Sequence, residues 1–252
     1  MRWRWPGLPS GSRICRWPRL DGLDRDVRLL TDHRESLVAE RTRVICRLRW
    51  HLHELDPAWE PNTRSLDRVS ALNQVEGRIA GLEGTVARLA RVLASRCREL
   101  TAQINELTTE LAALVSVQAP ALIAIPGCGT LTAAKILGET AGVGRFRSKD
   151  AYARHNGTAP LPVWSSNKAH HRLSRTGNRQ LNAALHRIAM TQAHWHPAAK
   201  DLMARRKAGG DSGLEALRVL KRRLSDVVYA ALHADLAAKQ QPALMSDSAA
   251  AA

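Results

Sequence analysis

The amino-acid sequence predicts an all-α protein with a helical linker, a long coiled-coil-like helix and a compact helical domain. The apolar residues are mostly Ala, Leu and Val, and aromatic residues make up only 4% of the 252 residues. Apolar side chains recur at steps of three and four positions over long stretches, which is the period of one face of an α-helix. The 11 Pro and 16 Gly are sparse within those stretches. This composition favours helices over sheets.

The N-terminal part of the sequence divides into an arm and a helix. Residues 1–19 have no helical or strand period, so we expect an irregular arm. Residues 22–55 carry apolar side chains at helical spacing and predict the first helix of a helical region that covers residues 20–118. Pro57 ends this helix, because a proline inside a helix lacks the N–H group that the next turn needs.

A second and longer helix is predicted over residues 66–118. Gly77, Gly81 and Gly84 weaken its first turns, so the part after Val86 is the most regular. An apolar stripe of this length predicts a coiled coil or an antiparallel hairpin, whose partner helix lies in the same chain or in a second copy. The stripe consists of Ile79, Leu82, Val86, Leu89, Leu93, Cys97, Leu100, Ile104, Leu107, Leu111 and Leu114.

Pro120 interrupts the stripe and begins a compact, mainly helical domain over residues 119–236. Residues 237–252 hold few large apolar side chains, so we expect a disordered tail. No apolar run is long enough to cross a bilayer, and the N-terminus lacks the apolar core of a secretory signal. We therefore expect a cytoplasmic protein without a membrane partner.

The charge of the sequence is strongly positive and unevenly distributed. The formal net charge is +15, and residues 145–223 contain 17 Lys and Arg against four Asp and Glu. Such an excess attracts polyanions, of which nucleic acid is the commonest. A merely solubilising role is less consistent with charge that is concentrated in one segment. DNA is therefore the expected partner of the 119–236 domain.

A glycine-containing turn, Ile125-Pro126-Gly127-Cys128-Gly129, precedes a stretch that predicts a helix from Leu131 to Glu139. The pattern resembles the hairpin of helix-hairpin-helix DNA-binding modules. Gly127 and Gly129 permit a tight turn and a close approach of another molecule, and the following helix offers free N–H groups to a phosphate. We expect both glycines to contact nucleic acid without reading its sequence. An ordinary helix–helix turn is the alternative.

A second motif, between Asn156 and Arg179, places hydroxyl groups beside a dense basic patch. A serine in such a patch can attack phosphorus if its proton is removed and the phosphate charge is neutralised. In the alternative interpretation the hydroxyls only cap turns, and Ser174 or Thr176 caps a helix that starts near Asn178. The cations expected to bind nucleic-acid phosphates are Lys168, Arg172, Arg175 and Arg179.

Several segments in sequence order resemble the transposases of the insertion-sequence-110 family. In the 119–236 domain they are IPGCGTLTAAKILGETAGVGRF, ARHNGTAPLPVW, HRLSRTGNRQLNAALH and ALRVLKRRLSDVVY. Upstream, RLLTDHRESLVAERTRV and RLRWHLHELDP are similar to the linker region of that family. The resemblance covers about residue 20 to residue 232.

The resemblance implies a fold and a chemistry. The family joins a RuvC-like domain, whose four acidic residues hold Mg²⁺, to a coiled coil and a C-terminal domain. A serine of the C-terminal domain links covalently to DNA during strand exchange, which an element-encoded structured RNA guides. The matching position in this sequence is Ser165, and Ser166 stands where the family usually has glycine. The resemblance also implies a homo-oligomer.

The family's acidic RuvC-like segment would precede residue 20, where only about 19 dissimilar residues stand. We therefore expect a truncated copy and assign no metal ligand and no cofactor to this chain. Two alternatives follow: a catalytically inactive, nucleic-acid-binding remnant, and a helix-hairpin-helix accessory protein of DNA repair or recombination. An upstream reading frame that encodes the acidic domain would favour the enzyme.

Overall fold

A computed structural model of the chain describes residues 21–62, 65–164, 169–172 and 177–249. The described residues form two compact units: a helical-hairpin unit (residues 29–113) and a C-terminal unit (residues 1–28 and 114–252). In chain order the elements are α1 (Leu23–Leu55), α2 (Val69–Ile79), α3 (Thr85–Gln118), α4 (Pro120–Ile123), α5 (Thr130–Thr140), the 3₁₀ helix η1 (Val143–Arg145), α6 (Lys149–His155), β1 (Leu161–Trp164), β2 (Ala169–Arg172), α7 (Arg179–Trp195), α8 (Pro197–Ala208) and α9 (Gly213–Ala249). The predicted all-α fold class is confirmed.

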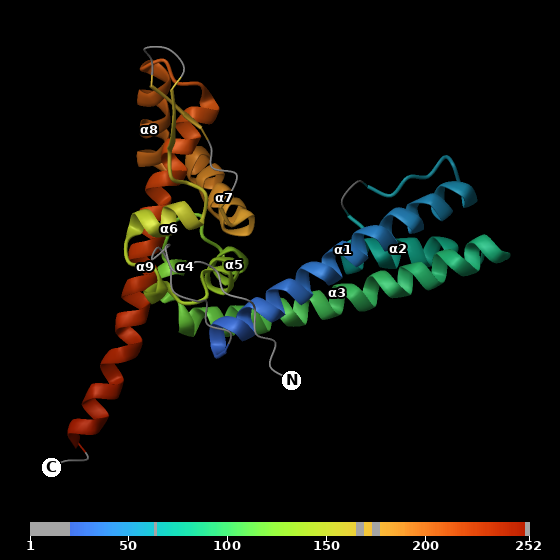
Figure 1. The fold of residues 1–252 in the computed structure, drawn as a ribbon. Helices are drawn as coiled ribbons and strands as arrows, with labels where there is room; N and C mark the ends of the chain where they lie inside the picture. The colour runs from blue at the N-terminus through green and yellow to red at the C-terminus, as the bar shows by residue number, and fades with distance from the viewer. Residues whose placement is uncertain (1–20, 63–64, 165–168, 173–176, 250–252) are drawn as a thin grey trace, which may run out of the picture. The chain divides into compact units, whose positions relative to one another are not determined.

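In the helical-hairpin unit, α1 and α3 lie side by side (Figure 1). They run antiparallel, because Arg34 donates to Thr108 (2.7 Å) while Arg41, two turns further along α1, reaches back to Thr101 (3.1 Å). The apolar stripe of α3 thus finds its partner within the chain, which is one of the two arrangements predicted. The core of this unit contains Leu37, Val44, Leu48, Leu52, Leu72, Val75, Ile79, Leu93, Cys97, Leu100 and Ile104.

The single helix predicted over residues 66–118 is wrong, since the chain turns between α2 and α3. At this turn Gly84 has a φ of 99°, a conformation that residues with a side chain rarely adopt. The predicted stripe therefore fails at its start: Leu82 is 40% and Leu89 37% exposed. Small side chains of α3 are buried there instead, namely Ala87, Ala90 and Ala94.

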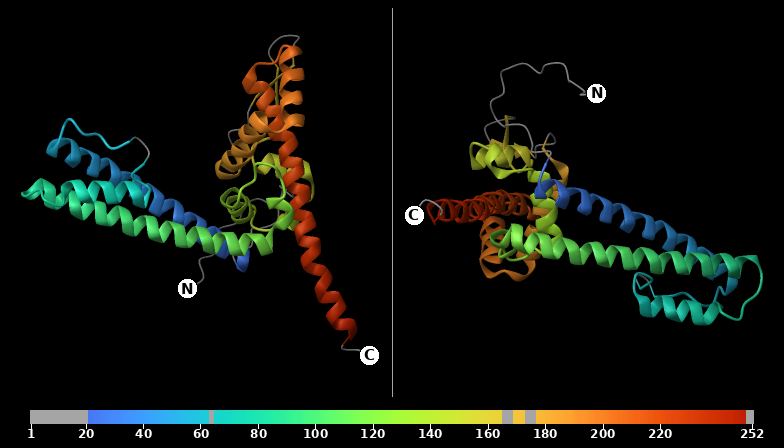
Figure 2. Two further views of the ribbon diagram at one scale, coloured as in Figure 1. Left: turned by 180° about the vertical axis from the view of Figure 1, so that it is seen from behind. Right: turned by 90° about the horizontal axis from the view of Figure 1, so that it is seen from below.

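The C-terminal unit is organised around α9. Helices α4, α6, α7 and α8 all pack against α9, and α5 packs against α7. Figure 2 shows α7 and α8 beside the N-terminal half of α9. The apolar residues of α7 recur at helical spacing, which turns one face of that helix into the core. The largest buried side chains here include Tyr152, Leu181, Leu185, Ile188, Leu224 and Val228.

The last helix extends beyond the part that packs. We predicted a disordered tail after residue 236, but α9 continues to Ala249, so that prediction is wrong for the described residues. Ala and Gln make up about half of residues 237–249, and both have high helix propensity. The predicted arm, residues 1–19, lies outside the described residues. No helix in the described part of the chain combines the length and the apolarity that crossing a membrane requires.

Candidate nucleic-acid interface

A two-stranded hairpin occupies the segment that the sequence showed only as turn-rich and polar. Strands β1 and β2 are antiparallel, with Leu161 opposite Arg172 and Trp164 opposite Ala169. Four residues connect the strands. Eight described residues of the motif between Asn156 and Arg179 therefore lie in paired strands, which the all-α prediction did not contain.

The predicted catalytic and phosphate-binding residues follow the course of this hairpin. Ser165 comes directly after β1, but it lies outside the described residues, as do Lys168 and Arg175. Arg172 ends β2. Arg179 begins α7, and its side chain is exposed. The predicted roles of these residues remain predictions.

The two ends of the hairpin segment meet through their backbones. A Cβ atom on Gly177 would lie 2.5 Å from the Cα of Gly157 and 3.0 Å from the carbonyl carbon of Asn156, so only glycine fits there. Next to this contact, the backbone N–H of Asn178 donates to the carbonyl of His155 (2.6 Å). The chain thus leaves the end of α6, forms the hairpin and returns to the same point before α7.

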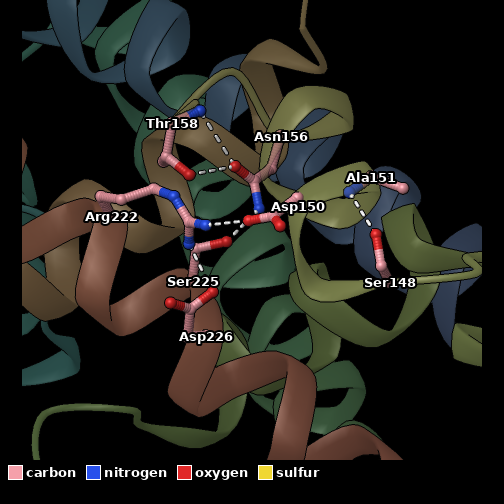
Figure 3. Close-up of polar contacts among 8 residues, drawn as sticks. All are labelled: Ser148, Asp150, Ala151, Asn156, Thr158, Arg222, Ser225 and Asp226. Carbon is pink, nitrogen blue, oxygen red and sulfur yellow. Dashed lines mark hydrogen bonds and ion pairs between the residues drawn. The ribbon is translucent and has the colours of Figure 1, made fainter. Parts of the chain in front are cut away.

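A buried asparagine fixes the first end of this segment (Figure 3). Asn156 is fully buried, and its side-chain N–H donates to the hydroxyl of Ser225 on α9 (2.8 Å). Its side-chain oxygen accepts from the backbone N–H (3.0 Å) and the hydroxyl (2.6 Å) of Thr158. Every polar atom of the Asn156 side chain is thereby satisfied, as a buried amide requires.

A second asparagine fixes the other end. The side-chain oxygen of Asn178 accepts from the backbone N–H groups two and three residues later (2.9 and 3.0 Å), and so caps α7. Its side-chain N–H donates to Glu139 on α5 (2.7 Å). The predicted cap, Ser174 or Thr176, lies outside the described residues; Asn178 performs this role in the structure.

A third polar connection joins α7 to α9. The side-chain N–H of Asn182 donates to the backbone carbonyl of Asn156 (2.9 Å), and its oxygen accepts from the ammonium of Lys221 (2.6 Å). Lys221 is only 7% exposed. Asn182 therefore couples a buried cation on α9 to the end of the hairpin.

An ion pair outside these amides ties α6 to α9 (Figure 3). Arg222 pairs with Asp150 on α6 (2.6 Å) and with Asp226 one turn further along α9. Ser148 caps α6 by accepting from the N–H of Ala151 (3.2 Å). These contacts hold α6, and with it the start of the hairpin segment, against α9.

A neutral histidine lies at the end of α6. Arg145 approaches His155 Nε2 at 3.1 Å, and because a guanidinium can only donate, Nε2 accepts and the ring is uncharged. Burial and the charge of Arg145 lower the pKa of His155 to about 4, although a hydrogen bond to the backbone of Glu139 acts in the opposite direction. Arg145 also donates to the carbonyl of Thr140 (2.8 Å).

The two glycines of the turn before α5 differ in what a side chain at their positions would meet. Gly127 has a φ of 80°, and a Cβ there would lie 3.1 Å from the Thr191 side chain, so this glycine permits close packing on α7. Gln192 of α7 donates to the carbonyl of Pro126 (2.7 Å). Gly129 precedes α5 with open space where its side chain would be. Both glycines are exposed, so their backbones are accessible to another molecule, but only Gly127 also lies where a side chain would meet α7.

Three residues of the polar network were missed by sequence reasoning: Asn182, Lys221 and Ser225. All three lie inside helices, where no turn or glycine marks them. The available signal is that Lys221 and Ser225 interrupt the apolar stripe of α9, beside Leu220 and Leu224. A polar residue on a core-facing stripe needs a partner, and its partner cannot be identified without the fold.

No metal was assigned to this chain from its sequence. Among the described residues, no group of three or more His, Cys, Asp or Glu side chains is arranged to hold a metal ion.

The comparison with known protein families finds a match to part of the C-terminal unit. Residues 119–204 match the family described as Transposase IS116/IS110/IS902 family, over about a third of the chain. The match begins at α4 and includes the glycine turn, the hairpin and α7. This part of the chain is therefore similar to the transposases of that family. No curated protein matches the chain.

Proposed function

We propose that this chain binds DNA through its C-terminal unit and carries the serine that becomes linked to DNA during transposition. The main support is the family match, which includes the hairpin with Ser165 and both asparagines that anchor it. The charge gives independent support, since the C-terminal unit has 26 Lys and Arg against 11 Asp and Glu. Cations in such excess bind the phosphates of nucleic acid.

The proposed chemistry is a transesterification at phosphorus. The Oγ of Ser165 forms a bond to phosphorus while the bond from phosphorus to one sugar oxygen breaks. The serine proton ends on the released sugar hydroxyl, so atoms and charge balance and no oxidant or reductant is needed. The cations proposed to neutralise the phosphate are Lys168, Arg172, Arg175 and Arg179.

DNA binding is tested with a labelled 30-base-pair duplex of arbitrary sequence at a series of NaCl concentrations. We expect the logarithm of affinity to fall linearly with the logarithm of salt concentration, by about 0.9 for each phosphate neutralised. Arg179→Gln should flatten this slope, whereas Arg88→Gln, an equal charge change on exposed α3, should not. Absence of binding at low salt, or binding that ignores salt, would overturn the proposal.

The serine is tested separately by its covalent product. The chain is incubated with DNA that flanks its coding sequence, with Mg²⁺ and the RNA transcribed from that region, and then denatured. The reaction is run with and without an added RuvC-like domain of a family member. A labelled protein–DNA adduct that disappears in Ser165→Ala supports the assignment. An adduct that persists in Ser165→Ala but not in Ser166→Ala assigns the chemistry to the neighbouring serine. If neither reaction yields an adduct, the chain is a nucleic-acid-binding remnant.

Guide RNA and self-association are further parts of the proposal, supported by the resemblance. We expect the RNA transcribed from the flanking DNA to bind more tightly than an unstructured RNA of equal length. We also expect a mass above that of the monomer in light scattering at micromolar concentration. Because the stripe of α3 already packs on α1, another surface has to supply the contact between copies.

A further inference from the structure

A buried cation without a carboxylate partner lies between α7 and α9. Lys221 is 7% exposed, and its ammonium donates to the side-chain oxygen of Asn182 at 2.6 Å. In the described part of the chain no carboxylate lies within ion-pair distance of this ammonium. The neighbouring Arg222, by contrast, pairs with two carboxylates.

The electrostatic neighbours of Lys221 in the described part of the chain are themselves basic groups. Arg218 lies one turn earlier on α9, and its charge, after the effect of burial, lowers the pKa of Lys221. Lys221 in turn lowers the pKa of His186 on α7, where burial is again the larger cause. Arg179 and Asn182 share a face of α7 with His186, since they precede it by seven and four positions. Arg218, His186 and Arg179 are exposed.

This arrangement is unfavourable for the folded chain alone. A buried ammonium that contacts only a neutral amide recovers little of its lost hydration. Like charges on one helix face add repulsion. An anion placed against Lys221 removes both penalties. The cluster also adjoins the hairpin, because Asn182 binds Lys221 with its oxygen and the backbone of Asn156 with its N–H group.

We propose that Arg179, Arg218 and Lys221, with the imidazole of His186 between α7 and α9 as a polar contact, form a cationic seam that binds the phosphodiester backbone of DNA beside the β1–β2 hairpin. This inference rests on the proposed function, because DNA binding identifies the source of the phosphate. Lys221 supplies the buried charge, and Asn182 orients it. The exposed members continue the contact along the duplex. Phosphate contacts of this kind position DNA without reading its sequence.

The test compares Lys221→Met with Lys200→Met in the full chain. Both variants remove one positive charge, but Lys200 is an exposed residue of α8. We expect Lys221→Met to weaken binding of the 30-base-pair duplex about tenfold at moderate salt and to reduce the salt slope by about 1. Lys200→Met should change both quantities much less, and Lys221→Arg should restore the slope. A merely structural role of Lys221 would alter thermal stability and leave the slope unchanged.

Other outcomes are equally decisive. Equal slopes for the two methionine variants would overturn the seam. If Lys221→Met does not fold, Arg218→Gln at an exposed position replaces it, and we expect the same reduction in the salt dependence of DNA affinity. Loss of RNA binding with unchanged DNA binding would overturn the choice of DNA. If the unmodified chain binds no DNA, the proposed function fails instead. In that case the seam is tested by thermal unfolding in inorganic phosphate and in chloride at equal ionic strength. Phosphate should raise the unfolding temperature of the unmodified chain but not that of Lys221→Met.

Discussion

The two units of this chain use charge in different ways. The helical-hairpin unit has 12 Lys and Arg and 12 Asp and Glu, whereas the C-terminal unit has 26 and 11. In the first unit, arginines of α3 pair with carboxylates of α1 and α2, as Arg96 does with Glu40 (2.7 Å) and Arg98 with Glu76 (2.5 Å). In the second unit, cations outnumber the available carboxylates. The charge of one unit is balanced by pairing, while the excess of the other remains available to a polyanion.

The interiors of the two units also differ, in how far they depend on specific polar partners. The helical-hairpin core consists mainly of Leu, Ile, Val, Ala and Cys on helix stripes, and its buried polar side chains Thr31 and Thr101 carry small hydroxyl groups. The C-terminal unit also buries Asn156, Lys221 and Ser225, each of which depends on a specific partner. An apolar stripe tolerates many side chains of similar volume, but a buried polar group left without its partner costs about 1–3 kcal/mol. The comparison therefore predicts that single changes near the hairpin have larger effects than single changes on the paired surface.

The largest effect is expected from Gly177→Ala. Its new Cβ would overlap backbone atoms of Gly157, which cannot move without opening the end of the hairpin. We expect a loss of about 3 kcal/mol or more in the free energy of unfolding, measured by denaturant titration. The control is Gly129→Ala, where the Cβ enters open space and the change at this helix cap should stay within about 1 kcal/mol. Similar stabilities for the two variants would contradict the close backbone contact.

An intermediate effect is expected when His155 becomes protonated. Its pKa is about 4 in the folded chain and about 6.5 when unfolded. Between these values the unfolded state binds more protons, so stability is complete above pH 6.5 and declines as the pH falls toward 4. After allowance for its partial exposure, His155 should contribute about 1–2 kcal/mol to this loss. His155→Gln should remove that contribution in unfolding curves at pH 7 and pH 5. An unchanged pH dependence in this variant would show that other groups cause it.

The smallest effect is expected in the helical-hairpin unit. Glu76→Gln removes the ion pair between α2 and Arg98 of α3, in which both side chains are more than one-third exposed. Exposed pairs of this kind contribute about 0.2–1 kcal/mol, and salt reduces the contribution. Unfolding at low and at high salt measures the size of the contribution and its salt dependence. The control is Glu83→Gln in the neighbouring turn, which removes one negative charge as Glu76→Gln does. A loss comparable to that of Gly177→Ala would remove the distinction between the two units.

The sequence alone predicted α1, the regular part of α3 after Val86, and most of the apolar core of the helical-hairpin unit. Leu93, Leu100 and Ile104 recur at helical spacing, and all three are buried. The end of α1 was predictable from Pro57 because proline acts on its own neighbours. The break between α2 and α3 was only partly visible, since glycine permits a turn without requiring one. The excess of positive charge and the motifs of the 119–236 domain were likewise readable in sequence.

Only the tertiary structure decided how the ends of the hairpin are held. Asn156 meets Ser225, and Asn182 meets Lys221, across 69 and 39 positions of the chain. Residues so far apart leave no periodic trace, because each of these bonds joins polar groups of two different segments. Gly157 and Gly177 were visible as motif residues, but their mutual contact was not. Local patterns specify helices because backbone hydrogen bonds and side-chain spacing act within one or two turns. Long-range polar pairs depend on which helices pack together, and packing is a property of the whole fold.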